Sequence, residues 1–352
     1  MIRTLNSLRF ILILMIVISH STLPISQSMH DYLGECPVAI FFVISGFVLS
    51  LSKGEKLQNG ELSNKQFFLS RIFKLYPLHL VIIAIILPLD WLLGHLAPWY
   101  QILAHALLIQ CWYFGHDFVL ALNAPTWFIS DIIFFYLIFK YLYGWLMTSS
   151  WKSILPVMGI YMMSYILLSF KMEGDYSGGF IYFYPPFRMI DFMLGILLYR
   201  FYRSEWSRKI SNHIISFSSA GKAHILDTLL VLMVAGMYYL SIHSNPNFRC
   251  AALYWAPSII VVFYVAAIDK GKGWLTNFLH NRQLLWLGSI SMEIFFIHIL
   301  SFRIIQSIFL RIFGEDIPII GGQFCIALLL TIVMAWGAKR YIITPTYNKL
   351  KI

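Results

Sequence analysis

Long apolar runs fill this chain from one end to the other, and only short polar gaps separate them. Inside a lipid bilayer, backbone N–H and C=O groups have no water to bind, so such runs must form helices that satisfy these groups internally. Of the 352 residues, 59% are hydrophobic and 12% are charged, which excludes a soluble globular protein. No polar stretch is long enough for a second, water-soluble domain. We therefore expect an all-α polytopic membrane protein in which residues 1–352 form a single integral-membrane domain.

Ten of the apolar runs are long enough to cross the bilayer. If the N-terminus lies inside, most of the 26 Lys and Arg residues fall in cytoplasmic gaps, and the positive-inside rule places both termini in the cytoplasm. A further run at 99–114 is shorter and carries His105, so we expect an interfacial or re-entrant segment there. The ten predicted spans are residues 8–24, 37–52, 75–96, 125–147, 153–170, 187–202, 225–244, 250–268, 284–302 and 318–338.

The net charge of +10 raises the question of a nucleic-acid partner. The basic residues lie in the short gaps between apolar runs, which indicates membrane topology, and no nucleic-acid partner is expected. The four cysteines are scattered without the spacing of a metal site or a disulfide framework, so no metal is expected. The first run has no small-residue cleavage pattern and contains Arg9, so we interpret it as a retained span.

Two ionisable side chains share one face of the first predicted span. Arg9 and His20 have ten residues between them, which is almost three helical turns and about 16 Å along the helix axis. Ionisable side chains inside membrane helices usually face a polar cavity and mark a working site. The alternative is an Arg9 that reaches the membrane interface and a His20 that is bonded to a backbone carbonyl.

Two other short stretches also predict specific contacts. Arg71 and Lys74 lie one turn apart at the cytoplasmic mouth of the third span. They are either the usual positively charged residues on the cytoplasmic side of a membrane span, or a pair that binds the phosphates of a cytosolic cofactor. In the stretch FFVISGF, the Ser45–Gly46 pair permits close approach of a second helix.

Several acids also lie where a bilayer disfavours them. Asp131 is the only acid in its span, and it either orients a histidine or pairs with a cation. Arg188 and Asp191 are three residues apart on one helix face and can neutralise each other. Glu293 and His298 lie in the ninth predicted span, but a spacing of five residues does not place them on one face.

Six motifs occur in a fixed order along the chain: R-x10-H in the first span, FFVISGF, the basic pair before a proline, W-x-x-S, R-x-x-D-F-x-x-G and LG-x-IS followed by IH. This order resembles membrane-bound acyltransferase family 3, the O-acetylase group that modifies bacterial surface glycans, from Leu8 to about Pro345. The resemblance implies that an acyl group, usually acetyl from acetyl-CoA, is transferred to a sugar hydroxyl at the bacterial inner membrane. It also implies that Arg9 and His20 match the functional pair of the family, and that Arg71 matches its basic cytoplasmic motif.

The chain departs from the family pattern at two positions. The basic motif often reads R-x-x-R, whereas Lys74 supplies a point charge without the planar fork of arginine. Many members carry a glutamate where this chain has Ile132, and Asp131 is one residue earlier, as in another branch. One residue turns a side chain by about 100° on a helix, so the role of that glutamate is not assigned to Asp131. The C-terminal soluble hydrolase-like domain of some members is not expected.

We expect an O-acyltransferase that moves acetyl from acetyl-CoA to a hydroxyl of a cell-surface or lipid-linked polysaccharide, with no permanently bound cofactor. Arg71 and Lys74 would hold the nucleotide of acetyl-CoA, and Arg9 would assist. His20 would act either as general base or as acyl carrier, with its tautomer fixed by Asp131 or Glu293. The alternative is a proton-coupled transporter or flippase that uses the same groups as a proton relay.

Overall fold

The computed structural model describes residues 2–172, 175–217, 223–314 and 320–349, and in these ranges it contains helices and no strand. Eight helical segments are long and apolar enough to cross a membrane, which confirms the all-α polytopic fold. They are Gln27–Gln58, Asn64–Leu92, Thr126–Thr148, Trp151–Lys171, His224–Ile242, Pro246–Lys270, Ser291–Phe313 and Gly321–Asn348. The first and sixth predicted spans also form helices, of 17 and 18 residues, but they are not among these eight. The count of ten spans and the location of the termini stay predictions.

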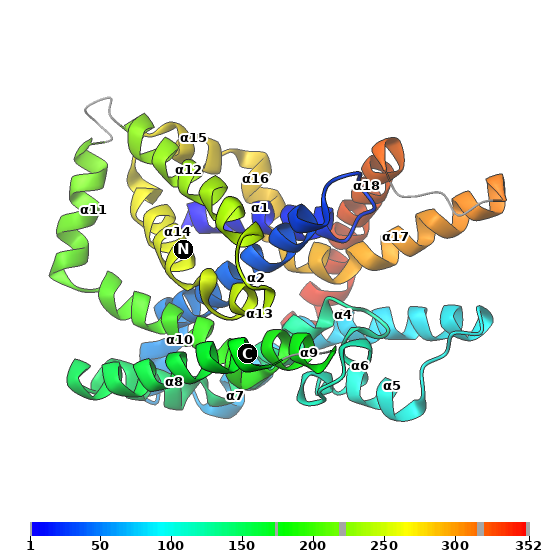
Figure 1. The fold of residues 1–352 in the computed structure, drawn as a ribbon, viewed down its shortest axis with the longest axis horizontal. Coiled ribbons are helices and arrows are strands. Elements are labelled where there is room, and N and C mark those ends of the chain that lie inside the picture. Colours follow the sequence, from blue (N-terminus) through cyan, green and yellow to red (C-terminus); the bar gives the residue numbers. More distant parts are fainter. Residues whose placement is uncertain (1, 173–174, 218–222, 315–319, 350–352) are drawn as a thin grey trace.

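The helices can be followed in Figure 1. In chain order they are α1 (Arg3–Ser19), α2 (Gln27–Leu49), η1 (Ser50–Gly54), α3 (Glu55–Gln58), α4 (Asn64–Leu92), α5 (Trp99–Ala106), η2 (Gln110–Trp112), α6 (His116–Leu120), α7 (Thr126–Thr148), α8 (Trp151–Lys171), α9 (Asp175–Phe183), α10 (Pro185–Tyr202), α11 (Glu205–Phe217), α12 (Ala223–Ile242), α13 (Pro246–Phe248), η4 (Arg249–Leu253), α14 (Trp255–Ala267), η5 (Ile268–Lys270), α15 (Trp274–Leu279), α16 (Arg282–Ser289), α17 (Ser291–Phe313), α18 (Gly321–Ala338), η6 (Lys339–Ile343) and α19 (Thr344–Lys349).

Helix α2 lies at the centre of the fold and packs against α1, α10, α12 and α14. Glycines let α2 and α10 approach closely, because a Cβ on Gly46 would overlap the carbonyl oxygen of Phe192. A Cβ on Gly195 would likewise overlap the carbonyl oxygen of Val43. The close helix approach predicted for the Ser45–Gly46 pair is therefore confirmed.

The ninth predicted span, residues 284–302, is wrong in its boundaries. The chain forms two helices there, α16 and α17, which meet at Ile290. Helix α16 packs across α1, and a Cβ on Gly288 would overlap the carbonyl oxygen of Asn6. Hydropathy alone could not show this break, because the apolar pattern continues through it while tertiary packing ends the first helix.

Residues 99–114 form no helix long enough to span a membrane, in agreement with the predicted interfacial or re-entrant segment. Side chains of α4 and α5 hold the segment through main-chain carbonyls. Tyr76 donates to the carbonyl of Ala106 at 2.6 Å, and the Nε2 of His79 lies 2.8 Å from the carbonyl oxygen of His105. His105 is itself buried, and its Nε2 lies 2.8 Å from a main-chain carbonyl oxygen of α6, so it serves to fix this segment.

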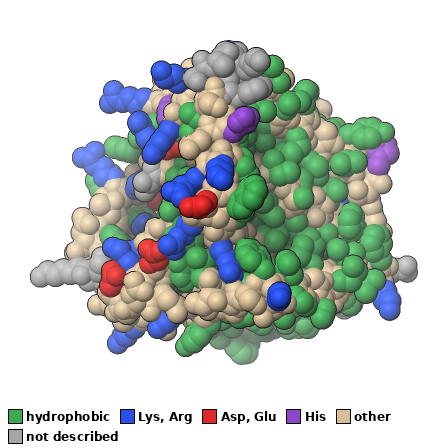
Figure 2. Space-filling model, turned by 90° about the vertical axis from the view of Figure 1, so that its left-hand side faces the viewer, with side chains coloured by type: hydrophobic (Ala, Val, Ile, Leu, Met, Phe, Trp, Pro, Cys, Tyr) green, Lys and Arg blue, Asp and Glu red, His purple; other side chains and the backbone are tan. Residues whose placement is uncertain are grey.

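The surface of the described residues is divided between apolar and basic areas. Large apolar side chains are widely exposed on the outer helices, for example Ile160 at 72% and Leu329 at 63%. Figure 2 shows the left-hand face of Figure 1, where Lys and Arg side chains gather beside a broad hydrophobic area. Such a division is typical of a membrane protein whose basic loops lie at one end of its spans.

Candidate active site

A cavity of about 480 Å3 opens between α1, α2, α4, α7, α17 and the C-terminal segment η6–α19. From Asn6 to Ile16, both of which line it, the cavity extends about 15 Å along α1, which is half the depth of a bilayer core. Four cations line its polar part: Arg9, Arg71, Lys74 and Lys339. Its apolar part is lined by Ile13, Ile16, Val38, Phe41, Phe128 and Phe295, together with other hydrophobic side chains.

The structure brings Arg9 of α1 to the same cavity as Arg71 and Lys74 of α4. The one-turn spacing of the α4 pair lets both side chains reach the cavity from one helix. Lys339, at the start of the π turn η6, was missed by sequence reasoning, which assigned it to a positive-inside flank. Its Nζ donates to the main-chain oxygen of Ser289, and this contact holds it at the cavity wall.

Arg9, Arg71 and Lys74 form no hydrogen bond or ion pair with another residue of the described ranges, and the buried Nε of Arg71 has no partner. Two of them face aromatic rings: the Arg71 guanidinium lies 5.6 Å from the Phe67 ring, and the Lys74 Nζ lies 5.6 Å from that of Tyr347. Like charges that share a cavity repel one another, and a polyanionic ligand removes that cost.

Glu293 is the only carboxylate among the residues that line this cavity. Its side chain is buried, and its Oε2 has no hydrogen-bond partner in the described part of the chain. One carboxylate cannot neutralise four cations, so the cavity keeps a net positive charge.

His20 ends α1, and the structure brings it to His298 of α17. The two ring centroids are 5.1 Å apart, and the Nε2 of His298 lies 3.4 Å from the Nδ1 of His20. Each ring also faces a carbonyl of its own helix: the His20 Nδ1 is 2.8 Å from Ile16 O, and the His298 Nδ1 is 2.8 Å from Phe295 O. These two residues come from the first and ninth predicted spans, and sequence reasoning had not paired them.

The carbonyl contacts assign the tautomer of both rings. Because a carbonyl oxygen only accepts hydrogen bonds, each Nδ1 that faces one must carry the proton. The Nε2 of neutral His20 therefore keeps its lone pair, and the residue is exposed at the end of α1. The predicted orientation of His20 by Asp131 or Glu293 is not what the structure shows, because the carbonyl of Ile16 holds its Nδ1.

A family model described as an acyltransferase domain matches residues 2–338. The chain belongs to this acyltransferase family. Over 289 residues it is 26% identical to "Acyltransferase MdmB" of Streptomyces mycarofaciens, a match that covers 77% of this chain and 69% of that protein. Over 367 residues it is 22% identical to a "Putative O-acetyltransferase" of Staphylococcus aureus strain COL, covering 97% of this chain and 56% of that protein. The same values hold for its counterpart in strain MRSA252.

The family assignment confirms the predicted enzyme class, an O-acyltransferase. The chain spans little more than half the length of the staphylococcal relatives. No solved structure matches it.

In this acyltransferase, Asp131 lies away from the histidine pair. It is fully buried on α7 near Arg188, and neither of its carboxylate oxygens has a hydrogen-bond partner among the described residues. Arg188 and Asp191 form a buried ion pair at 3.3 Å, which confirms the predicted mutual neutralisation. The Nη1 of Arg188 also donates to the carbonyl of Cys250 at 2.9 Å. This cluster joins α7, α10 and η4 without contacting the cavity.

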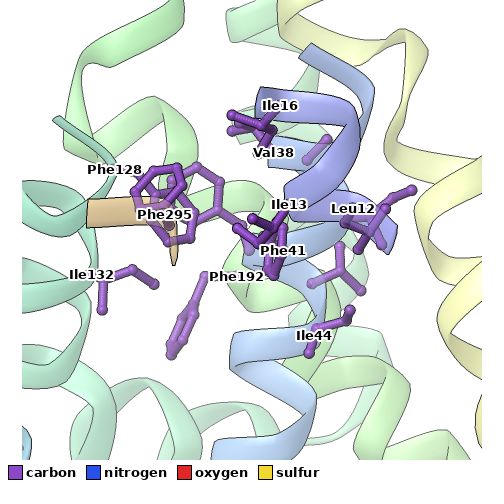
Figure 3. Packing of buried hydrophobic residues seen from close by; sticks show 14 of the residues in the cluster. Leu12, Ile13, Ile16, Val38, Phe41, Ile44, Phe128, Ile132, Phe192 and Phe295 are labelled. Carbon is purple, nitrogen blue, oxygen red and sulfur yellow. The ribbon is translucent and has the colours of Figure 1, made fainter. Parts of the chain in front are cut away.

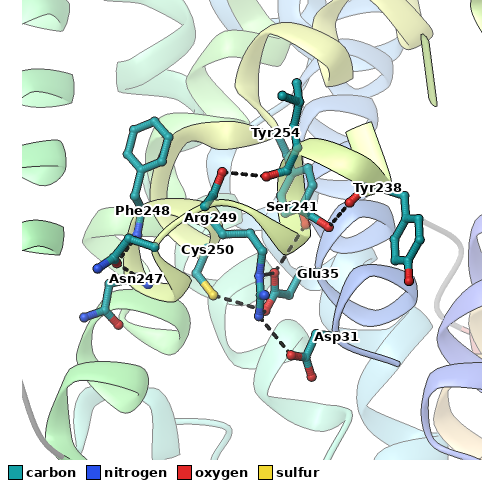
Figure 4. Close-up of polar contacts among 12 residues, drawn as sticks. Asp31, Glu35, Tyr238, Ser241, Asn247, Phe248, Arg249, Cys250 and Tyr254 are labelled. Atoms are coloured by element: carbon teal, nitrogen blue, oxygen red, sulfur yellow. Dashed lines mark hydrogen bonds and ion pairs between the residues drawn. The ribbon is translucent and has the colours of Figure 1, made fainter. Parts of the chain in front are cut away.

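A second network, shown in Figure 4, joins the start of α2 to η4. Arg249 binds the carboxylate of Glu35 through two contacts, Nε to Oε2 at 2.6 Å and Nη2 to Oε1 at 2.8 Å. Its Nη2 also lies 3.0 Å from Oδ2 of Asp31. Sequence reasoning missed this network, because nothing in the local pattern relates residues more than 200 positions apart.

Proposed function

We propose that this enzyme takes an acetyl group from acetyl-CoA on the cytoplasmic side of the bacterial inner membrane. It transfers that group to a hydroxyl of a cell-surface or lipid-linked polysaccharide. The observation that supports this best is the cavity itself. Its polar part holds the cations Arg9, Arg71 and Lys74, which form no ion pair with a described residue, and its apolar part ends one helical turn from His20.

Acetyl-CoA matches both parts of the cavity. Its nucleotide carries several phosphate charges, which suit four cations that a single carboxylate, Glu293, does not neutralise. Its long, uncharged pantetheine arm suits the apolar part that follows Ile13 and Ile16 along α1. The planar fork of Arg71 can hold a phosphate through two hydrogen bonds, and Lys74 and Lys339 add point charges beside it.

His20 is the group best placed for the chemistry, through its unprotonated Nε2. As general base, Nε2 takes the proton of the acceptor hydroxyl while that oxygen attacks the thioester carbonyl. The C–S bond then breaks, and the CoA thiolate takes the proton from the imidazolium. As nucleophile, Nε2 attacks the carbonyl itself and releases the thiolate. The acceptor oxygen then takes the acetyl group from Nε2, and the proton of its hydroxyl goes to the CoA thiolate. Both routes need the same tautomer.

His298 supports either route through its contact with the imidazole ring of His20. Its Nε2 carries a lone pair that faces the Nδ1–H of His20 at 3.4 Å. When the Nε2 of His20 gains a proton or an acyl group, positive charge develops on the ring, and the Nδ1–H becomes a stronger donor. This N–H already donates to the Ile16 carbonyl at 2.8 Å, and His298 then shares it as a second acceptor, in the way that the third member of a catalytic triad supports its histidine.

The test compares cells that lack this chain with cells in which it is restored. We expect the surface or lipid-linked polysaccharide to gain mass in steps of one acetyl group only when the chain is present. Membranes that contain the chain should also consume labelled acetyl-CoA when the acceptor is supplied. A transporter or flippase would change the location of the glycan but not its mass, and it would consume no thioester. That result would overturn the proposed function.

A further inference from the structure

Three phenylalanine rings that line the cavity lie close together (Figure 3). They come from three different helices: Phe41 from α2, Phe128 from α7 and Phe295 from α17. The Phe128 ring lies 6.1 Å from that of Phe41 and 5.5 Å from that of Phe295, both edge to face. Each of these side chains lines the cavity, and each is at most 7% exposed. They therefore form one continuous apolar wall.

The histidine pair lies next to this wall, on the side of Phe295. The ring of Phe295 is 6.1 Å from that of His298, and its carbonyl accepts from the His298 Nδ1. Ile16 also lines the cavity, and its carbonyl holds the His20 Nδ1. From Ile16 to His20 is about 6 Å along the helix axis. The imidazole of His20 thus lies one helical turn beyond a residue that lines the cavity.

We propose that Phe41, Phe128 and Phe295 are the residues that select the length of the transferred acyl group. This inference rests on the proposed function. A CoA thioester that enters from the cationic end presents its acyl group first to these three rings. A short acyl group can pass when one ring turns, whereas each added methylene must displace a packed side chain.

Two physical features favour selection by size at this wall. The rings offer no hydrogen-bonding group, so they discriminate acyl chains by volume alone. They are also held in place from three helices, so a longer chain cannot be accommodated by a shift of one helix end. Apolar pockets of this kind discriminate between chains that differ by one methylene by about 10- to 200-fold in kcat/KM.

The experiment measures kcat/KM for acetyl-CoA and for butyryl-CoA in membranes that contain the full chain and the acceptor glycan. The variants are Phe128→Ala, Phe128→Leu and Phe295→Leu. We expect the butyryl-to-acetyl ratio to rise by at least about tenfold in Phe128→Ala, and by less in the two leucine variants. A ratio measured within one preparation does not depend on how much of the variant inserts. The leucine variants keep most of the apolar volume if the alanine variant fails to insert.

Phe135→Ala is the matched control. Phe135 lies two turns further along α7 and is fully buried, but it does not line the cavity, so its loss should leave the ratio unchanged. An unchanged ratio in all three wall variants, in membranes that still transfer acetyl, would overturn this inference and leave the proposed function intact. Membranes in which the wild type consumes no CoA thioester would overturn the proposed function instead.

Discussion

Two of the regions that hold arginine inside the helical bundle differ in whether its charge is paired with a carboxylate. In the network at the start of α2, Arg249 has two carboxylates within 3.0 Å. In the cavity, Arg9 and Arg71 form no ion pair with any described residue, and Lys74 lies beside them. The comparison distinguishes arginines that connect helices through ion pairs from arginines that are available to bind an anionic ligand.

The difference has an energetic basis. A buried charge that loses its partner leaves the other charge uncompensated, so removal of one member of a buried pair is strongly destabilising. Cations that face one another across a cavity repel, so the removal of one of them relieves that repulsion and should not destabilise the fold. We therefore expect mutations in the two regions to affect different measurements.

The largest effect should follow from Arg249→Ala. This change leaves Glu35 and Asp31 without their cation, and we expect the free energy of unfolding to fall by about 3–5 kcal/mol. The measurement is thermal unfolding of the protein in detergent. Arg71→Ala is the control in the same assay and should unfold within a degree or two of the wild type. If Arg71→Ala is as unstable as Arg249→Ala, the distinction between the two regions is wrong.

The next effect concerns His20, which lies one helical turn beyond the apolar part of the cavity. His20→Gln keeps a hydrogen-bonding side chain but cannot act as base or nucleophile, so we expect acetyl transfer to fall by at least about a hundredfold. The measurement is acetylation per unit of membrane-inserted protein.

His243→Gln is the matched control for this change. The Nδ1 of His243 lies 2.8 Å from the carbonyl of Tyr239 at the end of α12, which is the same local contact that His20 makes with Ile16. Its replacement should leave acetylation unchanged. Near-normal acetylation by His20→Gln would remove His20 from the chemistry and direct attention to His298.

A smaller effect is expected from the cavity cations. Arg71→Ala should raise KM for acetyl-CoA by about 10- to 100-fold, because charge-assisted hydrogen bonds contribute about 1.5–3 kcal/mol. The phosphates lie far from the reacting carbonyl, so kcat should change little. Lys74→Ala should show the same pattern with a smaller rise, and Arg71→Lys should fall between because it lacks the planar fork. A normal KM in Arg71→Ala and Lys74→Ala would mean that both residues serve only as the positively charged cytoplasmic flank of a membrane span.

The smallest effect should come from Asp31→Asn. The Asp31 side chain is 32% exposed, and Arg249 keeps its two contacts with Glu35 when Asp31 is neutralised. We expect the free energy of unfolding to change by less than about 1 kcal/mol, as is usual for a partly exposed ion pair. A loss as large as that of Arg249→Ala would mean that Asp31, and not Glu35, is the principal partner of Arg249.

The sequence by itself determined the features that depend on neighbours along one helix. Run lengths gave the membrane class, the three-turn spacing placed Arg9 and His20 on one face, and Gly46 predicted close helix packing. The order of six motifs gave the family without any tertiary information. Each of these inferences uses only the fixed geometry of an α-helix and the apolar requirement of the bilayer.

Only the tertiary structure decided which helix faces meet. It placed His298 beside His20 across 278 positions of sequence, added Lys339 and Glu293 to the cavity, and put Asp131 next to Arg188 instead of His20. A repeat of 3.6 residues states which side chains share a face, but not which other helix that face will contact. That choice depends on complementary packing, such as the approach of Gly288 to Asn6, between segments far apart in the chain.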